Sequence, residues 1–217
     1  PPPPILSGLV GSEMCIRDSY DIDDVFISGN IIANVTEGIK IASAEGDICT
    51  RVPSNVIVSG NTLDAGKGII VVDHFRQAGC FWGAHNYSFY DNSVFGGEIG
   101  FEFTGNALEK DKFFLDIEVR DNSITSTNGI IIRHIDEIII HNNEIESNIG
   151  ISLVGSLSIE ITNNSVNSSL TGITAGREII DKKSTGIINF NTVEGTGTVG
   201  IFKDEESEFS LSNNSIS

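Results

Sequence analysis

Basic residues are scarce in this sequence. Its 217 residues include 13 Lys and Arg against 30 Asp and Glu, which gives a net charge of -17 at pH 7. A nucleic-acid backbone would be repelled by such a chain, and no basic stripe is present to release its counterions, so the composition argues against nucleic acid as a partner. An acidic polysaccharide would also be repelled unless a local cationic site or a bridging cation holds it.

Long apolar runs are absent, and Met and Trp are rare. No run of about 18 apolar residues occurs, so no transmembrane helix is predicted and no membrane partner is expected. One Met and one Trp stand beside 23 Gly, while a hydrophobic content of 39 % is sufficient for a core. This composition favours a turn-rich, all-β chain of one domain.

The common catalytic and cofactor motifs are missing too. No G-x-S-x-G, phosphate-binding loop or dinucleotide fingerprint is found. His74 and His85 have no third ligand at the spacing of a zinc site, so no metal is predicted. Two acidic stretches, 21–24 and 45–47, offer oxygen ligands for Ca²⁺ but lack a D-x-D-x-D-G loop, so calcium is the one cofactor with any support, and none is expected.

An internal repeat dominates what is present. The segments Ile138–Leu153 and Ile159–Ala175 follow one pattern, offset by 21 residues. In each, alternating apolar residues precede an Asn pair, one apolar residue follows two places on, and a Gly opens a second apolar strand. Such self-similarity outranks any local assignment of secondary structure.

Extended in both directions, the pattern has eight copies with three anchors each. Its turn asparagines are Asn30, Asn61, Asn92, Asn122, Asn143, Asn164, Asn191 and Asn214. Two places after each comes an apolar residue: Ile32, Leu63, Val94, Ile124, Ile145, Val166, Val193 and Ile216. The glycines that follow are Gly38, Gly68, Gly100, Gly129, Gly150, Gly172 and Gly200.

Short strands of three to five residues, joined by Asn and Gly turns, cannot each build a core alone but can do so when stacked. If each repeat is one winding, each Asn lies above the previous one, and the side-chain amides can hydrogen-bond along the stack at about 4.8 Å. In this respect residues 20–217 resemble the right-handed parallel β-helix proteins of the pectin-lyase-like superfamily. The resemblance implies an all-β coil of about eight windings with an inward asparagine ladder.

The ends of the chain do not fit the repeat. Residues 1–19 resemble a translated sequencing adapter, so we expect a non-native leader there and a single β-helix domain over 20–217. The last repeat stops just after its turn, and no cap is visible at either end, although open sheet edges are normally covered. We therefore expect the domain to be truncated at both ends.

Length variation is confined to one phase of the winding. The insertions are 43–53, 73–86, 105–112 and 176–183, and they should emerge along one edge of the coil, where solenoids collect binding loops. Cys49 and Cys80 are separated by the local period, so stacked loops could bring them within disulfide distance. Either a disulfide formed in an oxidising compartment or two free thiols fits this spacing.

Strand alternation selects candidate catalytic residues. The second and fourth residues after each Gly should point outward, which places Glu102 and Arg133 in adjacent windings. Asp73, His74 and His134 lie just beyond the same strand. These five residues could perform acid–base chemistry or bind a uronate carboxylate, and the alternative is an ordinary ion pair on a solvated face. In the resembled enzymes the substrate groove runs along the corresponding sheet.

Candidate substrate-binding residues form two groups. One is a second outward column, two residues before the ladder, where Tyr90, Arg120 and His141 occupy successive rungs and could bind sugar or simply pack across strands. The other is the loop that carries Arg76, Trp82 and His85, in which Trp82 either stacks on a ligand or covers the coil. The N-T-D, D-D, G-H-G and R-I-K motifs of polygalacturonase-like relatives and the D-P-H motif of alginate epimerase relatives are missing, so no known catalytic set transfers.

Two functions from different classes remain open. The first is an extracellular or cell-surface β-helix that binds a polysaccharide along its looped face, either with lyase, hydrolase or epimerase activity or without any. The second is a structural or adhesive rod, of the adhesin or phage tail-spike type. The outward apolar residues Ile57, Ile70, Ile131, Ile139 and Ile187 favour a packed partner in that case, so we expect a monomer for the first function and a homotrimer for the second.

Overall fold

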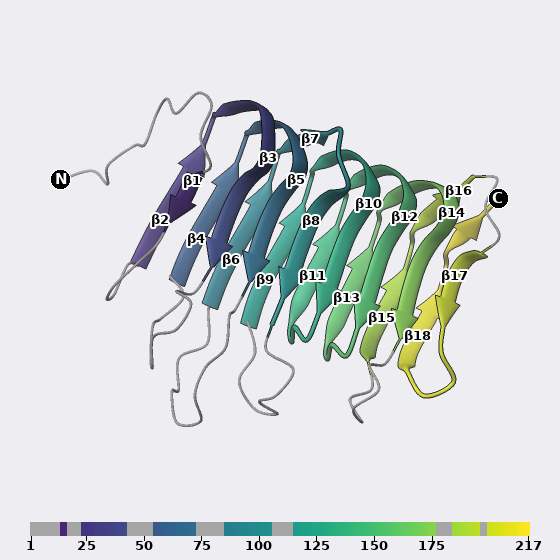
Figure 1. Ribbon diagram of the computed structural model, residues 1–217. Helices are drawn as coiled ribbons and strands as arrows, with labels where there is room; N and C mark the ends of the chain where they lie inside the picture. The colour runs from purple at the N-terminus through teal and green to yellow at the C-terminus, as the bar shows by residue number, and fades with distance from the viewer. Residues whose placement is uncertain are drawn as a thin grey trace.

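The computed structural model describes residues 14–16, 23–42, 54–72, 85–105, 115–176, 184–195 and 199–217. These residues form strands joined by turns, in two sheets whose neighbouring strands are all parallel. Figure 1 shows the windings side by side along one axis, from β2 at one end to β18 at the other. The chain is a right-handed parallel β-helix, as the repeat predicted.

An eight-stranded sheet holds the strands that precede the ladder asparagines. They are β2 (Asp23–Ser28), β4 (Ser54–Ser59), β6 (His85–Tyr90), β9 (Leu115–Arg120), β11 (Ile138–His141), β13 (Ile159–Thr162), β15 (Thr185–Asn189) and β18 (Glu208–Ser212).

An eleven-stranded sheet holds the strands that follow the ladder asparagines, with β1 added at its edge beside β3. They are β1 (Met14–Ile16), β3 (Ile31–Ala42), β5 (Thr62–Val72), β7 (Ser93–Phe95), β8 (Ile99–Thr104), β10 (Ser123–Arg133), β12 (Glu144–Val154), β14 (Ser165–Gly176), β16 (Thr192–Glu194), β17 (Val199–Lys203) and β19 (Ser215–Ile216).

The asparagine ladder runs without a break through all eight predicted positions. In each of the seven steps, the backbone N–H and the side-chain Nδ2 of one Asn both donate to Oδ1 of the next, at 2.9–3.1 Å. The first seven of these residues are buried. Because each amide meets its partners inside the coil, the ladder fixes the register of the windings.

Strand length differs from the prediction of three to five residues. In β3, β5, β10, β12 and β14 the segment after the Asn and the Gly-led segment form one strand of 11 or 12 residues. Pairing continues through the bend between the two segments, with a register shift between Ser147 and Ile149 in one pair and between Ala33 and Val35 in another. An irregularity of this kind bends a strand without ending it.

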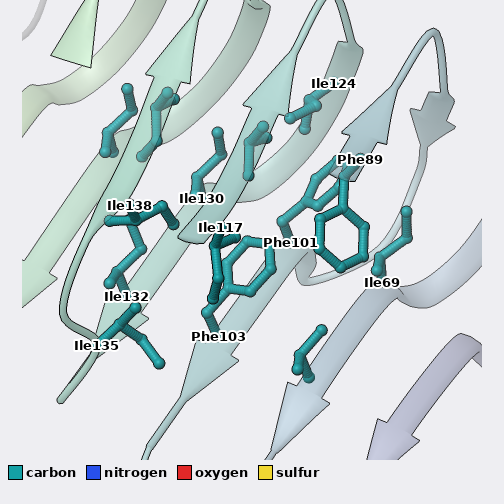
Figure 2. Close-up of a cluster of buried hydrophobic side chains, with 14 of the residues drawn as sticks. Ile69, Phe89, Phe101, Phe103, Ile117, Ile124, Ile130, Ile132, Ile135 and Ile138 are labelled. Atoms are coloured by element: carbon teal, nitrogen blue, oxygen red, sulfur yellow. The ribbon is translucent and has the colours of Figure 1, made fainter. Parts of the chain in front are cut away.

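The core fills the interior between the sheets. The residue two places after each Asn is buried in the first seven windings, as are the first and third residues after each Gly in the first six. Figure 2 shows an aromatic cluster within it, in which Phe89 meets Phe103 edge-to-face with ring centroids 5.2 Å apart and Phe101 stacks beside Phe103. Edge-to-face and offset contacts suit the ring quadrupoles, so this winding is packed around its aromatic residues.

The backbone of β1, within the predicted leader, pairs with Ile39–Ile41 of β3, and the division into leader and domain remains a prediction. Among the described residues, no helix is long and apolar enough to cross a membrane.

Candidate functional site

The residues of each predicted outward column are aligned across successive windings. Lys40, Ile70, Glu102, Ile131, Ser152, Thr174 and Phe202 are register partners across successive windings of the eleven-stranded sheet. The neighbouring row contains Thr104 and Arg133, which are also paired. This Gly-led face therefore presents polar and apolar residues on successive rungs, one strand spacing of about 4.8 Å apart.

Glu102 lies at the centre of a charged cluster on this face. Its Oε1 accepts a hydrogen bond from the Nη1 of Arg133 at 2.9 Å, and its Oε2 lies 3.4 Å from the Nζ of Lys67. The Glu102 side chain is only 14 % exposed, whereas those of Arg133 and Lys67 are 41 % and 36 % exposed. The carboxylate is thus recessed between two cations that still reach solvent.

The pair of Glu102 and Arg133 was predictable from strand alternation, but Lys67 was not. Regular alternation begins at the Gly, and Lys67 precedes Gly68 at the bend of β5. With Lys67 included, the cluster has two positive charges and one negative charge at neutral pH. A second pair, Lys40 with Glu37 at 3.2 Å, lies on the adjacent winding and adds no net charge. The three side chains of the cluster therefore carry one surplus positive charge on an acidic chain, and the exposed Glu98 lies at the same bend, where its backbone N–H donates to the carbonyl of Gly66.

His134 is more enclosed than Glu102 and Arg133. Its residue is 6 % exposed, and the backbone turns there with a φ of 55°. The imidazole lies against the next winding, because a side chain added to Gly155 would come within 2.9 Å of the ring Nδ1. His134 is thus enclosed at the corner of the coil, one residue beyond Arg133.

Several other predicted residues fall outside what the structure describes. Asp73, His74, Arg76 and Trp82 lie there, as do Cys49 and Cys80, so their roles and the disulfide remain predictions. His85 begins β6 by its backbone, and its side chain is not described.

The second predicted group does form a strip on the eight-stranded sheet. Tyr90, Arg120 and His141 are register partners on successive strands. The Arg120 guanidinium lies 4.2 Å from the centroid of the Tyr90 ring, a cation–π contact. Glu118 contacts both Arg120 and His141. Its Oε2 lies 3.4 Å from Nε of Arg120, and its Oε1 lies 3.0 Å from Nε2 of His141.

Asp121, which sequence reasoning missed, completes this strip. Its carboxylate accepts a hydrogen bond of 2.8 Å from the Nη1 of Arg120. That bond raises the pKa of Arg120 and lowers the pKa of the Asp121 carboxyl. Arg120 therefore meets two carboxylates and one aromatic ring within the protein, which leaves it less available to a ligand than Arg133.

The outward apolar residues differ in how much of each is exposed. Ile139 and Ile187 are each 43 % exposed, and Ile57 and Ile131 are half-buried. Ile70 was predicted to be exposed, but it is 2 % exposed and counts as core. It lies between the long side chains of Lys40 and Glu102 in its row, so pointing outward does not expose it.

No metal centre can be built from the described side chains. Among them, no three His, Cys, Asp or Glu residues come together as a metal site requires. The acidic stretch at 45–47, one of the two suggested for calcium, lies outside the described residues.

Comparisons with known proteins show the fold. No family model and no curated protein matches the chain. A solved structure of a mutant of the periplasmic alginate epimerase AlgG is similar with a TM-score of 0.63 and 14 % identity, over 90 % of this chain and 46 % of that one. A second AlgG mutant structure gives a TM-score of 0.47 at 13 % identity. This chain thus spans less than half the length of the protein in the first of these structures.

Proposed function

We propose that this chain binds an acidic polysaccharide along the Gly-led face of its eleven-stranded sheet. The observation that carries the proposal is the cluster of Lys67, Glu102 and Arg133, which has a surplus positive charge on a chain of net charge -17. A polyanion needs such a local site to approach an acidic protein.

The geometry of the cluster suits a carboxylate ligand. One edge of the Arg133 guanidinium is held by Glu102, and a planar guanidinium has further N–H groups that can bind a carboxylate. Lys67 supplies a second cation on the other side of Glu102, two windings from Arg133. Because Glu102 is recessed, it orients both cations and leaves their solvent-exposed sides for the ligand.

The structural comparison supports the same class of ligand. The first matched protein is named as an alginate epimerase, and alginate is a polymer of uronic acids. A shared fold does not imply a shared reaction, so the proposed ligand class depends on the cluster of Lys67, Glu102 and Arg133. Processing of the bound glycan, as lyase, hydrolase or epimerase, rests on Glu102, the one carboxylate of the cluster.

Titration of the intact chain with alginate hexasaccharides tests the binding. Substituting Arg133→Gln or Lys67→Gln should weaken binding about tenfold each, because each removes a charged hydrogen-bond donor. Lys203→Gln is the matched control, since Lys203 lies in β17 of the same sheet and donates to the Ser207 carbonyl. Equal weakening by all three variants would mean that only net charge matters, and no binding by the intact chain would end the proposal.

The same samples decide whether chemistry follows binding. New reducing ends would report a hydrolase, absorbance of unsaturated uronates a lyase, and a changed ratio of uronate epimers an epimerase. Glu102→Gln should then remove turnover in a protein that remains folded. Turnover that survives this substitution would exclude Glu102 from the mechanism.

An extracellular or cell-surface location is part of the proposal, because such polymers lie outside the cytoplasm. The matched epimerase is named as periplasmic, which supports an exported location for a protein that meets such polymers. Immunodetection in fractions of the source cells tests the location, and a signal confined to the cytoplasmic fraction would contradict it.

A structural or adhesive rod is the second candidate. Phe26, Ile139 and Ile187 lie in one outward column of the eight-stranded sheet and are 42–43 % exposed. Glu118 and Glu160 flank Ile139 in this column, so a partner subunit there would have to meet apolar and acidic side chains together. Size-exclusion chromatography with light scattering should then give a trimer, which Ile139→Asp should dissociate. A monomer at high concentration would exclude the trimeric rod.

A further inference from the structure

A groove lies on the eleven-stranded sheet, apart from the charged cluster. It follows the bend between the two segments of the long strands, from Gly96 in the third winding to Gly195 in the seventh, and has a volume of about 500 Å³. Four strand spacings separate these windings, so the groove is about 19 Å long. Figure 1 shows β7, β10, β12, β14 and β16 side by side along this stretch.

The walls of the groove are two rows of exposed polar side chains. Thr125, Glu146 and Asn167 form one row and are register partners. The other row consists of Thr127, Asn148 and Ser169, where the Ser169 hydroxyl donates to Oδ1 of Asn148 at 2.7 Å. Hydroxyl, amide or carboxylate groups therefore recur at the three central windings of the groove, across the direction of the strands, while its end windings contribute glycines.

The bend requires glycine at its two ends but does not require polar side chains at the wall positions. Glycine is required at both ends, since a Cβ at position 97 would lie 2.2 Å from the carbonyl oxygen of Ala65, and one at position 195 would lie 2.0 Å from that of Ser168. The wall residues face solvent and carry no such restriction. The first row itself holds a large residue one rung away, at Phe95.

Phe95 gives the first row an aromatic end. It pairs with Thr125 in register, and 42 % of it is exposed. An aromatic ring left partly in water has an apolar face that a sugar ring can cover. An aromatic face in line with hydroxyl, amide and carboxylate groups is an arrangement suited to stacking and hydrogen-bonding a chain of sugars.

Charge decides which sugars fit. Among the described residues that line the groove, Glu146 is the only charged one, and no Lys or Arg is present. A uronate chain would meet repulsion here and none of the compensation offered by Lys67 and Arg133. A hydroxyl-rich neutral chain can donate to Glu146 and exchange hydrogen bonds with the Thr, Asn and Ser groups.

We infer that this groove binds a linear neutral oligosaccharide lying along the axis of the coil. The site is separate from the proposed uronate site in both position and charge. The protein then has two glycan sites of different specificity on one rigid scaffold, one for an acidic chain and one for a neutral chain.

The test is calorimetric titration of the intact chain with hexasaccharides of β-1,4-glucan, β-1,4-mannan, β-1,4-xylan and α-1,4-glucan. At least one should bind, and Thr125→Tyr should abolish that binding by filling the groove. Ser123→Tyr is the matched control, because Ser123 is exposed in the same strand, on the same side, two residues outside the groove. Phe95→Ala should weaken binding about tenfold.

Each result bears on the inference. Silence with all four neutral sugars, from a protein shown to be folded by circular dichroism, would overturn it, as would equal losses in Thr125→Tyr and Ser123→Tyr. The uronate proposal stands or falls separately, since Arg133→Gln should leave neutral-sugar binding unchanged. Thr125→Tyr should likewise leave alginate binding unchanged.

Discussion

Removing one amide from the middle of the ladder should destabilise the whole coil. Asn143 is 1 % exposed, and its Oδ1 accepts from the backbone N–H and the Nδ2 of Asn122. Its own Nδ2 lies within 2.9–3.0 Å of the carbonyl oxygens of Val119 and His141 and of Oδ1 of Asn164. Asn143→Ala deletes all of these contacts.

The size of the effect follows from the groups left behind. Asn122 would lose the acceptor of its buried backbone N–H, whereas its Nδ2 would keep the carbonyl oxygens of Phe89 and Arg120 as acceptors. An unsatisfied buried polar group costs about 1–3 kcal/mol, so the loss is about 2 kcal/mol, a large share of the 5–15 kcal/mol that is roughly typical of folded proteins. The corresponding fall in melting temperature is about 6 °C, because each kcal/mol shifts a chain of this size by about 2–4 °C.

Urea unfolding followed by circular dichroism measures the change in unfolding free energy. Asn148→Ala is the matched control, because Asn148 lies in the next strand and is exposed, so its loss should change stability by less than about 0.5 kcal/mol. If Asn143→Ala proves no more harmful than this control, the ladder does not stabilise the coil and the reasoning is wrong.

Two further predictions concern the backbone and the surface charges. Gly129→Ala should reduce the unfolding free energy by about 3 kcal/mol, because its Cβ would lie 2.4 Å from the backbone oxygen of Gly150. Gly29→Ala meets no atom within 4 Å and should reduce it by only about 1 kcal/mol, because of the positive φ at that position. Thermal melts that show equal losses for the two variants would contradict this. Arg120 lowers the pKa of Asp121 in the folded state, so the ion pair stabilises the fold above the unfolded pKa near 4 and loses this effect as the pH falls through the lowered pKa. Asp121→Asn should therefore reduce the unfolding free energy by about 0.2–1 kcal/mol at pH 7 and leave it unchanged near pH 2, as measured by urea unfolding. A loss of stability that persists at low pH would exclude the ion pair as its cause.

The parts of the structure that the sequence could predict are those set by the period. Eight asparagines in phase placed every winding, and the register of both outward columns followed from counting residues relative to Asn and Gly. The contact of Glu102 with Arg133 was predictable for this reason, as was the row of Tyr90, Arg120 and His141. Alternation on a strand has a period of two, so a known anchor decides which face a residue takes.

The parts that could not be predicted lie where this counting fails. The bend inside each long strand interrupts alternation, and Lys67 lies there. His134 lies at a corner with positive φ, so its ring turns toward Gly155 and is enclosed, although its position in the sequence suggested the open face. Burial by neighbouring side chains is also invisible to counting, which is why Ile70 was wrongly predicted to be exposed.

The spacing of the repeats explains how one scaffold could hold two glycan sites. Successive asparagines are 21 to 31 residues apart, yet each step of the ladder has the same hydrogen bonds at 2.9–3.1 Å. Differences in length are therefore absorbed between the strands, while the side chains on the rungs keep one axial spacing. A linear sugar bound along the axis would meet a regular series of groups whose identity can change without disturbing the coil. The row at Glu102 and the row of Thr125, Glu146 and Asn167 are two such series. Asn122 and Asn143 fix the register beneath both, so replacing either should affect the two sites together.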